Sequence, residues 1–305
     1  MDESTIRRGH HNVHAFFLVM TTYILIFTFL FLLPGLQHSP AQFSKAPASI
    51  MSGTRLDVDI NGIVYLLDSK KNTVRRFSKD RVLLTEIGGS GWGDNRFDQP
   101  MGIWARNGID VFVADYGNHR IQRFDRNLSF VSSLYTRDRT NTDERFGYPT
   151  DVTLSRLGDL YICDGENSRI VKLSGFSKVE RSFGGFDAGR GRLHNPTRIE
   201  MGPQDHVYVV DGNRVVVFDS FGNFIRQIGN DLFTGELVIF ADAFGLVVLN
   251  DERLFVFDEN DALRTTIPVA SLVDASDSHV RSMAVQRRTL YLMTEDGLIT
   301  APDPR

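Results

Sequence analysis

The residues with most potential for chemistry are three arginines and one aspartate that recur at one position of an internal repeat. Apolar runs of about five residues end at positions 68, 115, 164, 211, 250 and 294. Thirteen residues before these ends lie Arg55, Gly102, Asp151, Arg198, Leu237 and Arg281. A guanidinium presents a planar fork that suits carboxylate or phosphate, so the charged positions predict a site for a small anionic ligand. The alternative is a structural ion pair between Asp151 and a neighbouring arginine, with the remaining arginines in solvent.

A second set of polar residues marks the turn after each apolar run. Four carboxylates end these runs and could be mistaken for catalytic groups or calcium ligands. Each repeat holds one, so they are expected to lie on a ring rather than to converge. Their predicted role is structural, because Asp and Asn bond to nearby backbone and stabilise turns. The predicted turn residues are Asp68, Asp115, Asn118, Arg120, Asp164, Asn167, Arg169 and Asp211.

Metal ligands and nucleophiles give no recognisable constellation. A zinc site needs clustered His, Cys or carboxylate side chains, and the eight histidines show no ligand spacing. The single cysteine, Cys163, lies inside an apolar run and is expected to be a small buried residue. We therefore predict no catalytic residue, no bound metal and no cofactor.

The elements that position these residues are paired strands repeated six times. An apolar strand, a turn and an alternating strand recur, and the steps between the strand ends are 47, 49, 47, 39 and 44 residues. Strand-rich repeats of this length are typical of propeller blades. The sequence thus predicts an all-β, six-bladed β-propeller.

The repeat resembles the NHL-repeat family in its motif. The second copy carries Phe97-Asp98-Gln99-Pro100, then Asp115, then Asn118-His119-Arg120-Ile121; the third carries Pro149, Asp164, Asn167 and Arg169-Ile170. The resemblance covers roughly residues 50 to 301 and implies the fold more strongly than a function. Zinc-dependent peptidyl-amidating lyases and lactonase-type propellers resemble this fold. Their channel histidines and carboxylate-and-asparagine sites have no clear match here.

The N-terminal segment is predicted to contact a membrane. Residues 1–14 are polar, and residues 15–33 form an uncharged run of 19 residues, enough to span about 30 Å of hydrocarbon. Arg7 and Arg8 before the run place the N-terminus in the cytoplasm and the propeller outside, in the periplasm or extracellular space. The alternative is secretion after signal cleavage near Ala41. Either arrangement is expected for an NHL-repeat protein of the membrane-anchored or secreted bacterial type. Residues 34–50 are interpreted as a linker with a closing strand, and residues 51–305 as the propeller.

Two loop excursions are expected to rim a binding surface. Residues 136–145 are rich in charge, and residues 186–192 join the third and fourth repeats. The net charge of −4 and pI of about 6.1 make nucleic acid an unlikely partner. The sequence therefore favours a binding or scaffold domain for a protein or a small anion. The alternative is a metal-dependent hydrolase or lyase, lactonase-like or peptidyl-amidating-lyase-like, which would use a divalent metal at the channel mouth.

Overall fold

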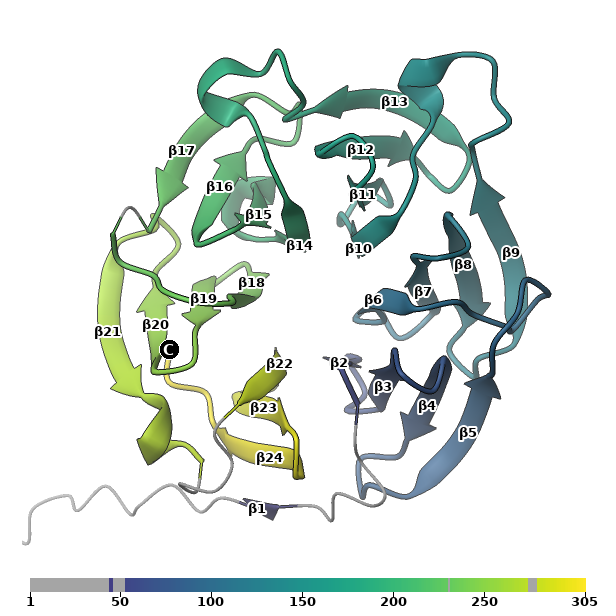
Figure 1. The fold of residues 1–305 in the computed structure, drawn as a ribbon. Coiled ribbons are helices and arrows are strands. Elements are labelled where there is room, and N and C mark those ends of the chain that lie inside the picture. The colour runs from purple at the N-terminus through teal and green to yellow at the C-terminus, as the bar shows by residue number, and fades with distance from the viewer. Residues whose placement is uncertain (1–43, 46–52, 230, 274–278) are drawn as a thin grey trace, which may run out of the picture. The chain divides into compact units, whose positions relative to one another are not determined.

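The computed structural model describes residues 44–45, 53–229, 231–273 and 279–305. The chain divides into two units, Met1–Gln42, which lies outside the described residues, and Phe43–Arg305. The second unit contains six four-stranded antiparallel sheets arranged around an axis (Figure 1). The expectation of an all-β, six-bladed propeller is confirmed. None of the described residues forms a helix long and apolar enough to cross a membrane, and the predicted span at residues 15–33 lies outside them.

The strands follow the chain from the axis outward in each of the first five blades. Blade one contains β2 (Arg55–Val58), β3 (Val64–Asp68), β4 (Thr73–Phe77) and β5 (Leu83–Gly88). Blade two contains β6 (Pro100–Trp104), β7 (Asp110–Asp115), β8 (Arg120–Asp125) and β9 (Phe130–Tyr135). Blade three contains β10 (Pro149–Leu154), β11 (Leu160–Asp164), β12 (Arg169–Ser174) and β13 (Lys178–Phe183). Blade four contains β14 (Pro196–Met201), β15 (Val207–Asp211), β16 (Arg214–Phe218) and β17 (Phe224–Ile228). Blade five contains β18 (Val238–Asp242), β19 (Gly245–Leu249), β20 (Arg253–Phe257) and β21 (Leu263–Pro268).

Blade six is closed by a strand from the other end of the chain. It contains β22 (Val280–Gln286), β23 (Thr289–Thr294) and β24 (Gly297–Pro302), and β1 (Ser44–Lys45) pairs with the outer edge of β24. These two residues fall within residues 34–50, where a closing strand was expected; the rest of that range lies outside the described residues. The pairing covers an edge of blade six that would otherwise expose unpaired backbone groups.

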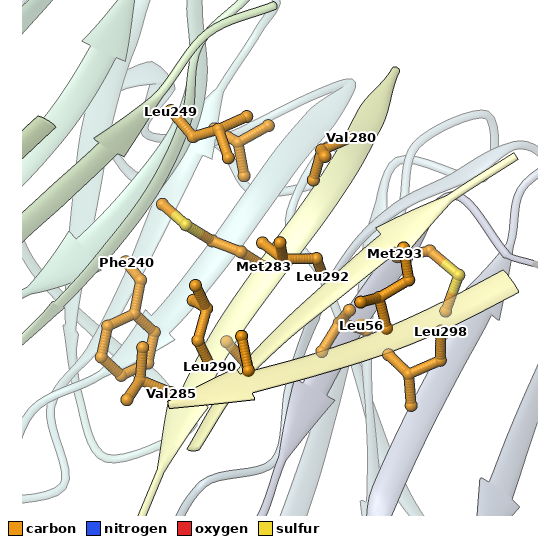
Figure 2. Close-up of a cluster of buried hydrophobic side chains, with 14 of the residues drawn as sticks. Leu56, Phe240, Leu249, Val280, Met283, Val285, Leu290, Leu292, Met293 and Leu298 are labelled. Carbon is orange, nitrogen blue, oxygen red and sulfur yellow. The ribbon is translucent and has the colours of Figure 1, made fainter. Parts of the chain in front are cut away.

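Burial explains why the second strand of each blade reads as a continuous apolar run. All residues of β3, β11, β15 and β19 are buried, because both faces of these strands pack against neighbouring blades. The outer strands β5 and β13 have no fully buried residue. Figure 2 shows one core cluster, in which Met283 and Leu290 of blade six join Phe240 of blade five and Leu56 of blade one.

Within the residues that the structure describes, four short 3-10 helices interrupt the loops. They are η1 (Thr142–Glu144), η2 (Gly189–Gly191), η3 (Pro203–Asp205) and η4 (Val269–Ser271). The first two lie within the two loop excursions. Each excursion therefore has local structure that fixes part of its backbone.

Candidate functional site

The carboxylate that ends β7 organises the turn between β7 and β8. Asp115 Oδ1 accepts a hydrogen bond from the backbone N–H of Asp98 at 2.8 Å. Its Oδ2 accepts from Asn118 Nδ2 at 2.9 Å and from Arg120 Nε at 2.8 Å. Burial raises the pKa of Asp115 above its ordinary value. The carboxylate is fully surrounded by donors from its own blade, so its task here is to hold the turn.

The same network recurs in blades three and four. Asp164 Oδ2 accepts from Asn167 Nδ2 at 2.8 Å and from Arg169 Nε at 3.0 Å. Asp211 Oδ1 accepts two backbone N–H groups, and its Oδ2 accepts from Arg214 Nη2 at 2.6 Å. In blade one, Asp68 instead accepts the backbone N–H groups of residues 70 and 71 at 3.1 Å each. These carboxylates lie one per blade and do not converge.

Three of the four predicted ligand residues gather at the beginning of the inner strands. We call Arg55, Asp151 and Arg198 the first level. Arg198 is 5% exposed and donates from Nη2 to the backbone carbonyl of Arg281 in blade six at 2.8 Å. Arg55 Nε donates to the carbonyl of Met101 at 3.0 Å. Asp151 accepts the N–H of Ile199 at 3.1 Å. The first level ties blades to one another across the axis.

Charges at the first level are nearly balanced within the protein. Burial and the charge of Arg55 lower the pKa of Arg198 to about 9. Burial raises the pKa of Asp151, which the two arginines oppose. Glu236, on the loop before β18, adds a second carboxylate 3.4 Å from Arg198. Two arginines and two carboxylates leave no excess positive charge for an anion to neutralise.

The other positions of the predicted ring do not join this cluster. The Arg281 guanidinium forms an ion pair with Glu295 of the same blade, so only the backbone carbonyl of Arg281 reaches Arg198. Leu237 lies just before β18 and is buried in an apolar cluster. Gly102 leaves room for its neighbour, since a Cβ there would come within 2.4 Å of Asp151 Oδ1. The ring is therefore a cluster of three side chains rather than six.

A second level of charge, which the repeat register did not single out, lies further along the inner strands. We define it as Asp57, Arg106 and Glu200. Arg106 Nε donates to Asp57 Oδ1 at 3.3 Å, Nη2 to Glu200 Oε1 at 2.5 Å, and Nη1 to the carbonyl of Ala241 at 3.0 Å. Its guanidinium lies 4.4 Å from the centre of the Phe240 ring. This one side chain connects blades one, two, four and five.

The second level could have been found from strand geometry. Side chains on one face of a strand recur every second residue, and Asp57 and Glu200 lie two positions after Arg55 and Arg198. Asp57 is 2% exposed, and burial raises its pKa. Burial likewise raises the pKa of Glu200 to about 8. Two levels of interlocked side chains thus occupy the centre of the ring, where they bind the blades together.

The first loop excursion is fastened to blade three. Arg169 Nη2 donates to the carbonyls of Thr142 and Arg145 at 3.3 and 2.9 Å. Arg137 Nη2 forms an ion pair with Glu166 Oε1 at 2.6 Å. The loop is therefore a structured rim rather than an independent solvated segment.

The second excursion borders a hollow of about 650 Å³. Asp143 of the first excursion lies on one side of this hollow, and residues 186–188 of the second lie on the other. Phe186 is 75% exposed, and the Arg192 guanidinium lies 4.2 Å from the centre of its ring. Blade three and blade four supply the remaining lining, which includes Asn167 and Phe224. An exposed aromatic ring beside a hollow is typical of an interaction surface.

The part of the chain that the structure describes has no group of side chains able to bind a metal ion. Within residues 44–45, 53–229, 231–273 and 279–305, no three His, Cys, Asp or Glu side chains converge as a metal site would require. Cys163 is buried, and burial raises the pKa of its thiol well above the ordinary value. These residues therefore do not fit the divalent metal of the lyase or lactonase alternative.

Comparison with known proteins identifies similar repeats and folds. Residues 146–173, which contain β10, β11 and all but the last residue of β12, match the family model described as NHL repeat. Human NHL repeat-containing protein 3 is 26% identical over 194 residues, covering 58% of this chain and 54% of the human protein. A probable peptidyl-alpha-hydroxyglycine alpha-amidating lyase of Caenorhabditis elegans is 30% identical over 103 residues, covering 33% of this chain and 28% of that protein. The chain thus spans about half or less of the length of these relatives.

Solved structures share the architecture at low sequence identity. A gluconolactonase from Xanthomonas campestris superposes with a TM-score of 0.59 at 13% identity, covering 87% of this chain and 90% of that chain. Likeness at this identity shows the fold alone. The chain is thus similar to the NHL repeat over residues 146–173 and to NHL repeat-containing proteins, and it shares the propeller fold with the solved structures.

Proposed function

We propose that this chain is a binding or scaffold propeller that holds a protein partner on the surface between its two loop excursions. The observation that carries the proposal is the exposed Phe186 beside the 650 Å³ hollow. Aromatic and arginine side chains contribute most to protein interfaces, and Phe186 and Arg192 are stacked in this position before any partner arrives. The two levels of charged side chains occupy the centre of the ring, so we place the binding surface on the outside of the propeller.

The geometry of the rim supports a preformed interface. Arg169 holds the first excursion against blade three, and Asp143 of that excursion borders the hollow. In the second excursion, the Leu193 N–H donates to the Gly184 carbonyl at 2.8 Å. A partner that inserts an apolar side chain beside Phe186 would meet a surface that needs little ordering, which favours affinity.

The experiment is selection of peptides from a displayed random library against the purified full chain. Individual peptides are then titrated against the wild type and Phe186→Ala. We expect selected peptides to carry an apolar anchor and to lose about tenfold in affinity for Phe186→Ala, since that side chain would be a central contact.

Phe244→Ala is the matched control. Phe244 is 74% exposed, as Phe186 is, but it lies in the turn between β18 and β19. The control should keep the wild-type affinity within about twofold. Equal losses in the two variants, or a library that yields no saturable binder, would exclude the excursion surface as the binding site.

A hydrolase or lyase is the second candidate, favoured by the similarity to the nematode lyase. Such a protein would act near the beginning of the inner strands, where Arg55, Asp151 and Arg198 lie. Metal analysis of the purified chain distinguishes the two candidates: stoichiometric zinc or calcium would favour the enzyme. The absence of a bound metal after purification with metal-supplemented buffers would favour the binding protein.

The membrane location is proposed from the sequence of residues 15–33. An uncleaved span would tether the propeller outside the membrane with the N-terminus in the cytoplasm. The mass of the mature protein tests this directly. An intact N-terminus supports the anchor, and a chain beginning near Ala41 supports secretion.

A further inference from the structure

A second hollow, of about 540 Å³, is lined by other residues of the second excursion. It is bordered by residues 189–192 of the excursion, by the beginning of β16 and by β17 of blade four. The lining is strongly basic and contains Arg190, Arg192, His194, Arg214 and Arg226. Such a concentration of arginine is notable in a chain whose net charge is −4.

Two of these arginines are fixed by buried carboxylates. Arg214 donates to Asp211 through Nε at 3.1 Å and Nη2 at 2.6 Å, while its Nη1 donates to Gln227 at 2.8 Å. Arg226 Nη2 forms an ion pair with Asp261 Oδ2 at 2.7 Å. Asp211 and Asp261 have nearly buried side chains, so each carboxylate faces its arginine rather than the open hollow. These pairs form a rigid floor.

The other two arginines are oriented by aromatic rings. The Arg190 guanidinium lies 5.3 Å from the centre of the Phe224 ring, and that of Arg192 lies 4.2 Å from the centre of Phe186. Neither forms an ion pair with a carboxylate within the described ranges. A guanidinium stacked on a ring keeps its N–H groups at its edges, where they can donate to an oxyanion.

The basic hollow has a larger excess of positive charge than the centre of the ring. Four arginines line it and two carboxylates contact them, which leaves an excess of two positive charges. The first level near the axis has two arginines and two carboxylates and no such excess. Like charges held close together repel one another, and a bound anion would remove that cost.

We propose that this basic hollow on blade four binds a small multivalent anion that carries phosphate or carboxylate groups. Its volume falls within the range of small-molecule sites, and stacked arginines can grip either group with two parallel hydrogen bonds. The site goes beyond the proposed protein-binding surface, with which it shares Arg192. Arg190, Arg214 and Arg226 belong to the basic hollow and do not line the hollow beside Phe186.

The test is calorimetric titration of the purified full chain with pyrophosphate and, separately, with citrate at low ionic strength. We compare the wild type with the double variant Arg190→Gln/Arg192→Gln. The expected result is saturable binding of at least one anion by the wild type and a loss of about tenfold or more in the variant. The preferred anion indicates whether the natural ligand carries phosphate or carboxylate.

The double variant Lys79→Gln/Arg126→Gln is the charge-matched control. These two residues are exposed, lie in the turns after β4 and β8, and form no ion pair with a carboxylate in the described part of the chain. The control should retain wild-type affinity. Equal weakening in both variants would reduce the effect to overall charge, and no saturable binding of either anion would overturn the site. Peptide and anion are titrated separately, so this proposal and the protein-binding proposal can fail independently.

Discussion

The arginines at the centre of the ring and those on the outer side of blade four have the same chemistry and opposite surroundings. Arg106 and Arg198 are enclosed, and carboxylates at the same level match their charge. Arg190 and Arg192 lie on an open loop and are stacked on aromatic rings. Burial and charge balance, rather than residue type, separate arginines that hold a fold together from arginines able to receive a ligand.

Replacing an enclosed arginine and replacing an exposed arginine should change the stability of the protein by different amounts. An enclosed arginine keeps buried carboxylates neutralised, so its loss leaves them unpaired. An exposed arginine loses only solvated charge, and surface pairs contribute little to stability. Substitutions in the two regions should therefore divide into large effects on folding and large effects on binding.

Replacement of Arg106 by Met should give the largest loss of stability. Asp57 forms an ion pair with Arg106, and Glu200 accepts a hydrogen bond from it, so both acidic side chains would be left buried beside each other without this partner. Removing one partner of a buried ion pair typically costs about 3–5 kcal/mol. The measurement is equilibrium unfolding in denaturant.

Arg288→Met is the control for the Arg106 variant, since it removes an exposed arginine. It should change the free energy of unfolding by less than about 0.5 kcal/mol. If Arg106→Met were equally mild, the second level would not hold the blades together, and the contrast between centre and surface would fail.

The sequence predicts the scaffold well because local chemistry repeats. The Asp115 turn and the apolar runs place β7 and β8 closely, since turn residues and buried strands leave direct signals. The thirteen-residue offset also finds Arg55, Asp151 and Arg198 together. The offset cannot show that the Arg281 side chain forms an ion pair with Glu295 rather than joining the first level, because this pairing depends on the position of Glu295 in the same blade.

The basic hollow could not be predicted from the sequence, because its arginines come from separate segments. Arg190 and Arg192 lie in an excursion outside the repeat register, whereas Arg214 and Arg226 belong to strands of blade four. Only the return of the excursion over β17 brings them together. Residues 186–192 do line the two hollows, and binding there stays a prediction. The charge excess depends on tertiary contacts that no spacing encodes.

Replacement of Arg198 by Met should have a smaller effect than replacement of Arg106. Asp151 would keep Arg55 nearby, and the repulsion between the two arginines would disappear. The main loss is the hydrogen bond to the Arg281 carbonyl, which is expected to cost about 1–2 kcal/mol. Thermal unfolding with and without phosphate measures this. Protection by phosphate in the wild type that vanishes in Arg198→Met alone would restore the first level as an anion site.

Glu200 contributes a pH dependence to the stability of the fold. Burial raises its pKa from the ordinary 4.5 to about 8. Between these values the folded protein holds a proton that the unfolded chain releases, so stability falls as pH rises through this window and levels off above it. The slope is at most about 1.4 kcal/mol per pH unit for one group. Asp57 acts in the same direction, since burial raises its pKa too.

Glu200→Gln isolates this contribution, because the amide keeps the shape of the protonated carboxyl and does not titrate. Stability measured by denaturant unfolding at intervals from pH 5 to pH 8 should fall less steeply in the variant than in the wild type. The pKa of Asp211, in contrast, is lowered: burial would raise it, but hydrogen bonds from Asn195 and Arg214 prevail. Its contribution is therefore lost only as pH falls below about 4, in a separate window. Identical slopes in the two proteins between pH 5 and pH 8 would mean that Glu200 is ionised throughout and that the enclosed arginines hold full charge pairs at neutral pH.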